Sequence, residues 1–105
     1  MRKIDLQPYP IPQHKGVDGK PLQFDVKDSL IELLFLEGTM PAKERLNREK
    51  LAQIIEAANG QILLEEADWS KLVGGLPYAD MKGRHFNEFV RRVYEAPEIT
   101  VRESE

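Results

Sequence analysis

Several features that define common functional classes are absent from this 105-residue sequence. It contains no cysteine, which excludes disulfides and thiolate metal sites and leaves the redox compartment undetermined. The longest apolar run, Leu30 to Leu36, is interrupted by Glu32 and is far shorter than the roughly 20 residues of a membrane-spanning helix. Asp5 and prolines stand where a signal peptide would need an apolar stretch. We therefore expect neither a membrane span nor export by that route.

A surplus of positive charge is also missing. The net charge is −3, residues 1–60 carry nine basic and nine acidic side chains, and residues 61–105 carry six against nine. A general polyanion binder would show a basic excess or a basic stripe. The charge balance therefore disfavours a general nucleic-acid binder.

Motifs for catalysis or metal binding are scarce. The two histidines, His14 and His85, have no second ligand at helical or hairpin spacing. Glu65, Glu66 and Asp68 cluster where a helix is expected to start. Acidic side chains are favoured there by the helix dipole, so we prefer this explanation to a role in acid–base catalysis. No nucleophile elbow, zinc-protease motif or Walker loop is present. We expect no catalytic residues, no metal and no cofactor, and we interpret the chain as a non-enzyme.

What is present is the composition of a single folded domain, with 41% hydrophobic and 31% charged residues. Residues 2–6 and 22–26 alternate as half-buried strands, and Asp18-Gly19 between them predicts a hairpin with a long loop. Because this loop leads into a strand rather than a helix, it does not fit a phosphate-binding loop. Pro8, Pro10 and Pro12 hold the chain extended without ladder donors, as in an edge strand or an arm.

Hydrophobic periodicity predicts four short helices after the hairpin. Their expected ranges are about 27–37 with Asp25 or Asp28 as cap, 47–58, 65 to the stop at Gly74-Gly75, and 84–95. Residues 61–64 fit either a strand or a helix entry, and Ile99 and Val101 predict a closing strand. The fold class is therefore α+β: a hairpin or arm (1–26), a helical part (27–95) and a terminal strand with tail (96–105).

The apolar stripes of these helices predict the core. The side chains expected to be buried are Leu30, Leu33 and Leu34 in the first helix, Leu51, Ile54, Ile55 and Ala58 in the second, Trp69, Leu72 and Val73 in the third, and Phe86, Phe89, Val90 and Val93 in the fourth.

Four phrases, FDVKDSLIELLFLEG, LNREKLAQIIEAA, ILLEEADWSKL and FVRRVYEAPEITV, together cover most of the chain after residue 24. They resemble small proteins encoded in tailed-phage and prophage genomes, among or near virion genes. The resemblance implies a non-enzymatic phage protein, either a part or helper of the particle or a factor acting on a host protein. It would act in the host cytoplasm during infection or in the phage particle.

Two functional hypotheses follow. The first is an interaction protein that docks on a larger assembly, such as virion components, or on its own copy, through an exposed backbone edge. Its expected binding residues are Tyr9, Pro10, Ile11, Pro12, Lys15, Asp18 and Lys20.

The second hypothesis is a regulator that binds nucleic acid or a nucleic-acid enzyme through Lys82, Arg84, His85, Arg91 and Arg92. It is the weaker one, because Arg92 can pair with Glu88 and Arg91 with Glu95 on a helix, which would neutralise much of the patch. The connection before this helix is also longer than the turn of a helix-turn-helix motif.

Overall fold

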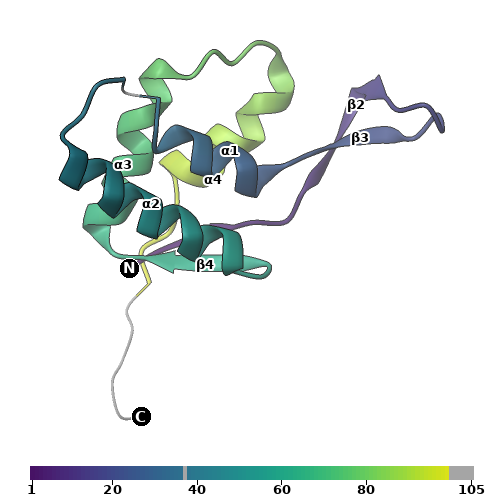
Figure 1. Ribbon diagram of the computed structural model, residues 1–105. Helices are drawn as coiled ribbons and strands as arrows, with labels where there is room; N and C mark the ends of the chain where they lie inside the picture. Colours follow the sequence, from purple (N-terminus) through teal and green to yellow (C-terminus); the bar gives the residue numbers. More distant parts are fainter. Residues whose placement is uncertain (37, 100–105) are drawn as a thin grey trace.

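Two separate two-stranded antiparallel sheets and four α-helices form the part of the chain that the structure describes (Figure 1). The structure is a computed structural model that describes residues 1–36 and 38–99, without the side chains of residues 12–14. The predicted α+β class is confirmed. The elements are β1 (Arg2–Asp5), β2 (Tyr9–Lys15), β3 (Pro21–Phe24), α1 (Val26–Leu33), α2 (Ala42–Ala57), β4 (Gln61–Leu64), α3 (Glu66–Gly75) and α4 (Asn87–Tyr94), with short 3₁₀ turns η1 (Leu76–Tyr78) and η2 (Arg84–Phe86).

The first sheet joins β1 to β4, from Arg2 opposite Leu64 to Asp5 opposite Gln61. The prediction that residues 2–6 pair with residues 22–26 is therefore wrong, whereas a strand at residues 61–64 is confirmed. Ile62 and Leu64 alternate along β4 and form a buried face together with Ile4 of β1. The chain enters β4 through Gly60, whose carbonyl accepts a hydrogen bond from the Leu6 amide (2.9 Å).

The second sheet is the β2–β3 hairpin, with Tyr9 opposite Phe24 and Ile11 opposite Leu22. The proline-containing segment is thus the first strand of the hairpin and not an arm that precedes it. Prolines are tolerated in β2 because β2 has only one neighbouring strand in the described chain. A residue without an N–H can therefore face the side of β2 that has no strand next to it. Strand β3 ends at Phe24, and Val26 already belongs to α1.

The helices differ from their predicted limits for local reasons. Asp25, one of the two predicted caps, caps α1, and its Oδ1 accepts from the Asp28 amide (3.0 Å). Helix α2 begins at Ala42, directly after the boundary at Pro41 and before the stretch 47–58 in which its periodicity is clearest, with Glu44 in its first turn. Helix α4 begins at Asn87 rather than at residue 84, because residues 84–86 form the 3₁₀ turn η2.

Helix α3 ends at Gly75, at the predicted glycine pair, and the 3₁₀ turn η1 follows it directly. A Cβ at position 75 would lie 3.0 Å from the carbonyl carbon of Leu33 and closer still to its oxygen. Gly75 therefore also allows close packing of α3 against the end of α1.

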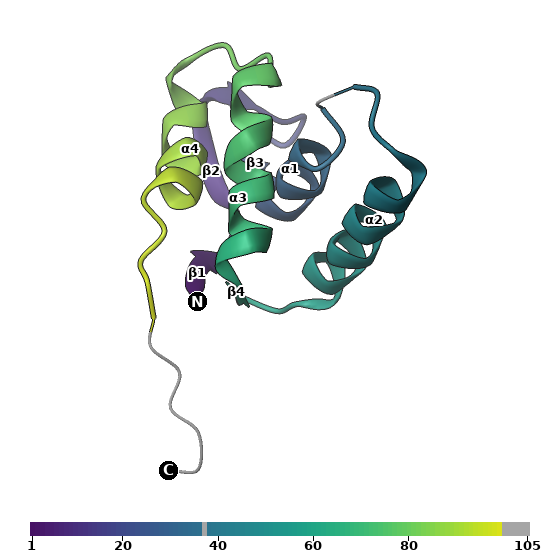
Figure 2. The same cartoon turned by 90° about the vertical axis from the view of Figure 1, so that its left-hand side faces the viewer.

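Helices α2, α1, α3 and α4 lie next to one another in that order, as Figure 2 shows. Most of the predicted core is confirmed, because Leu30, Leu33, Leu34, Leu51, Ile55, Leu72, Phe89 and Val93 are buried. Ile54 is an exception: its side chain is 57% exposed, and Ala52 and Arg48 are buried on α2 in its place. The buried side chains of α2 therefore lie on a face of the helix that is rotated about the helix axis from the predicted face.

The segment of residues 97–99 runs antiparallel to β1, so the two described ends of the chain lie side by side. The Lys3 amide donates to the carbonyl of Pro97 (3.1 Å), and Arg2 and Glu98 form a single β-bridge. Within the described residues, the predicted closing strand corresponds to this bridge and to Ile99, whose amide donates to the carbonyl of Met1 (2.6 Å), and Val101 lies outside the described residues. No helix in residues 1–36 and 38–99 is long and apolar enough to span a bilayer.

Candidate functional site

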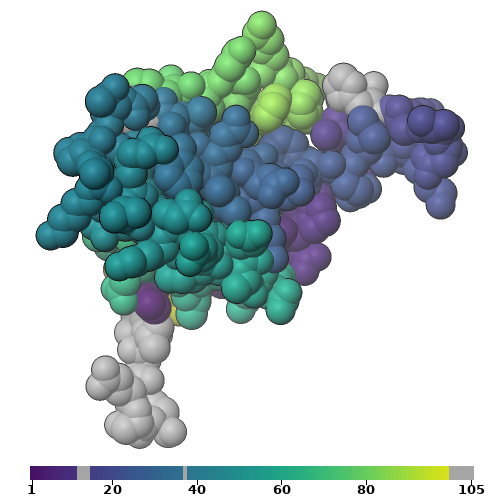
Figure 3. Space-filling model, viewed as in Figure 1, coloured from purple at the N-terminus to yellow at the C-terminus, as the bar shows by residue number. Residues whose placement is uncertain are grey.

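The outer half of the β2–β3 hairpin projects from the helical body as a separate lobe (Figure 3). Its tip, residues 15–20, closes through the Gly16 amide, which donates to the carbonyl of Lys20 (2.8 Å). The Gly19 amide donates to the carbonyl of Gly16 (3.0 Å). Gly19 also has the positive φ of 78° that this turn requires. The Asp18 side chain accepts from the Lys20 amide (3.0 Å). These bonds give the tip a defined shape.

An aliphatic side chain occupies the outermost position of this turn. Val17 is fully exposed, between Lys15 and Lys20, which are exposed as well. Turns favour Gly, Pro, Asn, Asp and Ser because these residues satisfy the local backbone, and valine offers no such advantage. Val17 was absent from the predicted binding residues, although its apolar character in a turn is a signal that the sequence contains.

The base of the hairpin is anchored in the body by Tyr9. Its ring stacks on Phe24 with centroids 5.0 Å apart, and its hydroxyl donates to the carbonyl of His85 (2.6 Å) and accepts from the Phe89 amide (3.2 Å). Burial of the hydroxyl raises the pKa of Tyr9 above its ordinary value. Tyr9 therefore joins the hairpin to the start of α4.

The structure divides the predicted binding residues into two groups. Tyr9 is half-buried and Ile11 is buried, so both belong to the base of the hairpin. Pro10, Lys15, Asp18 and Lys20 are exposed, and the side chain of Pro12 lies outside the described residues. The hairpin thus has an anchored base and an exposed tip.

Backbone pairing with a partner strand has limited support along β2. Pro10 and Pro12 have no N–H, so two of its seven residues cannot donate to an added strand. Strand β2 is therefore a poor edge for β-augmentation, and the side chains of the tip are the better candidates for contact.

The predicted basic face does not form one free patch. Lys82 and Arg84 are exposed, whereas the ring of His85 packs on Phe86 with centroids 4.4 Å apart. Arg92 bonds to Glu88 (3.1 Å), as predicted, and donates to the carbonyl of Gln7 (2.6 Å).

Arg91 also bonds to Glu88, one turn before it, and the predicted partner Glu95 acts on Arg91 only through its charge. The hydrogen bond from Arg91, helped by that from Arg92, lowers the pKa of Glu88, and the same contact raises the pKa of Arg91. Both arginines of α4 are therefore committed to intramolecular contacts.

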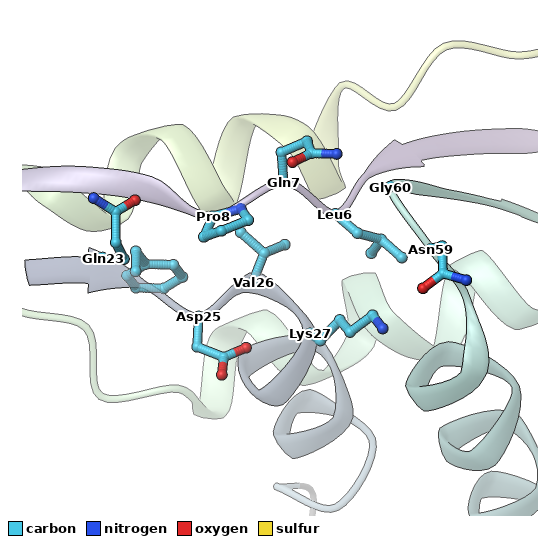
Figure 4. A pocket seen from close by; sticks show the side chains of 10 residues that line it. Leu6, Gln7, Pro8, Gln23, Asp25, Val26, Lys27, Asn59 and Gly60 are labelled. Carbon is cyan, nitrogen blue, oxygen red and sulfur yellow. The ribbon is translucent and has the colours of Figure 1, made fainter.

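A cavity of about 470 Å³ lies where the two sheets meet, between the β1–β2 connection, the start of α1 and the turn before β4 (Figure 4). Leu6, Phe24 and Val26 contribute its apolar lining. Its charged lining residues are already engaged: Asp25 caps α1, and the Lys27 Nζ donates to the carbonyl of Glu56 (3.0 Å). This cavity has a volume suited to a small molecule, but both of its charged side chains are used within the fold, which leaves the amides of Gln7, Gln23 and Asn59 as its polar lining.

A second cavity, the α1–η1 pocket, has about 260 Å³ and lies between α1 and the segment that follows α3. Its apolar lining comes from Leu33, Leu36, Met81, Phe86 and Phe89, and its polar lining from Ser29, Glu32, Tyr78 and Asp80. Tyr78 is 59% exposed at this pocket. No sequence pattern predicts this pocket, because η1 and residues 79–81 meet α1 only in the tertiary fold.

Metal ligation finds no support in the described residues, which contain no group of three or more His, Cys, Asp or Glu side chains able to hold an ion. No family model matches this chain, and neither the curated proteins nor the solved structures contain a significant match to it. Function is therefore argued from the geometry of the hairpin tip and the pockets.

Proposed function

We propose that this protein is a non-catalytic interaction protein that docks on a larger protein complex through the tip of its β2–β3 hairpin. The observation that carries the proposal is the fully exposed Val17 between two exposed lysines on a turn that is closed by its own hydrogen bonds. The partner is expected to offer an apolar socket with acidic groups around it, since such a surface complements both the valine and the lysines.

The rigidity of the hairpin base supports this proposal. Tyr9 and Phe24 stack on each other, and Phe24 also packs against Phe86 and Phe89 with ring centroids 5.3 Å apart in both cases. A tip held in place before binding loses less conformational entropy when it docks. The chain therefore presents its tip at a low entropic cost.

The biological setting of the proposal is a phage particle or its assembly in the host cytoplasm. It is supported by the resemblance of ILLEEADWSKL and FVRRVYEAPEITV to small proteins encoded near virion genes. Virion components are accordingly the first partners to test.

Photo-crosslinking from the tip tests the proposal. A photoreactive residue at position 17 should yield a discrete protein adduct in extracts of the native source. The matched control carries the same residue at position 46, where Leu46 is exposed on α2. The unlabelled chain should compete the adduct away, and a Lys15→Glu/Lys20→Glu chain should compete poorly. If positions 17 and 46 give the same adducts, the hairpin is not the docking site.

Nucleic-acid binding through Lys82 and Arg84 is the weaker proposal, supported by the exposure of these two side chains. Its test is DNA affinity as a function of salt. A steep fall in affinity as the salt concentration rises would support it, and a flat or absent response would remove it.

A further inference from the structure

The α1–η1 pocket has the chemistry that the hairpin tip requires of a partner. We propose that the tip of one copy, with Val17 at its centre, docks into the α1–η1 pocket of a second copy. This inference rests on the proposed function of the tip, and it names a second copy of the chain as the partner that the tip contacts. The two surfaces lie on different parts of the same chain, so the contact would join unlike surfaces of neighbouring copies.

The apolar parts of the two surfaces match in kind. The tip offers one exposed branched aliphatic side chain, Val17. The pocket offers an apolar lining that includes Leu36, Met81 and Phe86, in a volume of about 260 Å³. Tyr78 stands exposed beside that lining, and an exposed aromatic of this kind is typical of a contact that excludes water on binding.

The net charges of the two surfaces are opposite. The exposed Lys15 and Lys20 outnumber the exposed Asp18 on the tip, while the charged residues that line the pocket are Glu32 and Asp80, both exposed. Neither of the two lysines and neither of the two pocket carboxylates has an ion-pair partner in residues 1–36 and 38–99. Lys82 is the nearest basic residue along the chain and does not line the pocket. Docking would therefore pair charges that are left uncompensated within one copy.

The geometry requires a second copy. The β2–β3 ladder and the Tyr9 anchor hold the tip away from the body, where it projects beside the helices (Figure 1). The pocket lies between α1 and residues 78–81, which belong to the helical body. Since the tip of a copy is held away from its own pocket, the contact joins two copies head to tail. Such a contact closes into a ring or continues as an open chain of copies.

Complementary charge reversal tests the proposal without any other partner. The tip variant is Lys15→Glu/Lys20→Glu, and the pocket variant is Glu32→Lys/Asp80→Lys. The wild-type chain should associate as its concentration rises in sedimentation equilibrium. Each variant alone should associate about tenfold more weakly or worse, because its tip and pocket then carry charge of the same sign.

The mixture of the two variants is the decisive sample. The acidic tip of one variant faces the basic pocket of the other, and the remaining basic tip faces an acidic pocket, so association should return towards the wild-type level. All four positions are exposed, so circular dichroism and thermal midpoints should match the wild type and show that the variants are folded.

Two results would overturn the proposal: a wild-type chain that stays monomeric at all concentrations, or a mixture that associates no better than its components. A photoreactive residue at position 17 in the purified chain adds the location of the contact, because the self-adduct should map to residues 29–36 or 78–86. If the purified chain gives no self-adduct while native extracts still give an adduct with another protein, this inference fails and the proposed function stands.

Discussion

The two small sheets of this chain have the same number of strands but different surroundings. In the β1–β4 sheet, Ile4, Ile62 and Leu64 are buried, and the segment after α4 bonds to the other side of β1. Among the described side chains of the β2–β3 hairpin, Ile11 and Phe24 at the base are buried, whereas Leu22 and Val17 are exposed. An isolated two-stranded hairpin is marginally stable at best. The comparison indicates that the first sheet contributes more to the stability of the fold than the outer hairpin does, and an outer hairpin of this kind fits the contact with a partner that we propose.

Substitutions in the helical body should therefore lower the free energy of unfolding, and the largest decrease is expected where α1 and α3 meet. Gly75→Ala places a Cβ against the backbone of Leu33, which cannot yield as a flexible side chain would. We expect a loss of about 3 kcal/mol in the free energy of unfolding, measured by urea denaturation. Ser70→Ala on the exposed side of the same helix is the control and should change it by less than about 0.5 kcal/mol. Equal effects would mean that α1 and α3 are not in close contact.

The second largest cost is expected at Arg48, which is only 7% exposed. Its guanidinium donates to the carbonyl of Leu34 just after α1 (2.8 Å) and to Glu44 (2.9 Å). Arg48→Met keeps most of the buried stem but leaves that carbonyl without this donor, so we expect a loss of about 2 kcal/mol by urea denaturation. Lys50→Met, on an exposed position of α2, should be close to neutral. If both variants behave alike, the contact between α2 and α1 does not depend on Arg48.

An intermediate cost is expected at the anchor between the hairpin and the body. Tyr9→Phe removes the hydroxyl that bonds to His85 and Phe89, for a loss of about 1 kcal/mol. Burial raises the pKa of Tyr9, so the folded state holds this proton more tightly than the unfolded state. The associated stability is present below the ordinary pKa of 10.0 and is lost as the pH rises above it.

The unfolding free energy measured between neutral and alkaline pH should therefore fall less for Tyr9→Phe than for the wild type. Tyr94→Phe is the matched control, because it removes a tyrosine hydroxyl from an exposed side chain and not from the half-buried anchor. An identical alkaline slope for the wild type and Tyr9→Phe would contradict the buried anchor.

The smallest effect on stability is expected at the tip. Val17→Ser removes an aliphatic side chain that contacts solvent, so the free energy of unfolding should change by less than about 0.5 kcal/mol. The same substitution should weaken the self-association described above and should make the chain a poor competitor for the adduct, which separates binding from folding. A loss of stability comparable to that of Tyr9→Phe would show that the tip packs on the body after all.

Much of this fold could be predicted from periodicity and capping. The stripe of Leu30, Leu33 and Leu34 and the cap at Asp25 are local signals, and both are confirmed. The pairing of β1 with β4 could not be predicted, because these strands lie far apart in the sequence and the Asp18-Gly19 turn offered a nearer partner. The exposure of Ile54 depends on how α2 packs on α1, which a helical pattern alone does not specify.

The candidate site was only partly visible in the sequence. Lys15, Asp18 and Lys20 were predicted because they surround a turn, and they do lie at the exposed tip. Tyr9 was predicted as a binding residue, yet its hydroxyl is used inside the fold, since His85 and Phe89 reach it only through tertiary packing. The α1–η1 pocket could not be predicted because it combines residues from three separate segments.

Backbone hydrogen exchange of the free chain tests the central claim most directly, because it reports the opening free energy of each amide. The amides of Ile4 and Leu6, which belong to the buried sheet region, should exchange only through global unfolding. The amides of Gly19 and Lys20 at the tip should exchange through far less costly local openings. If the tip and the β1–β4 sheet exchange with the same opening free energy, the hairpin is part of the stable body and the division between the two sheets is wrong.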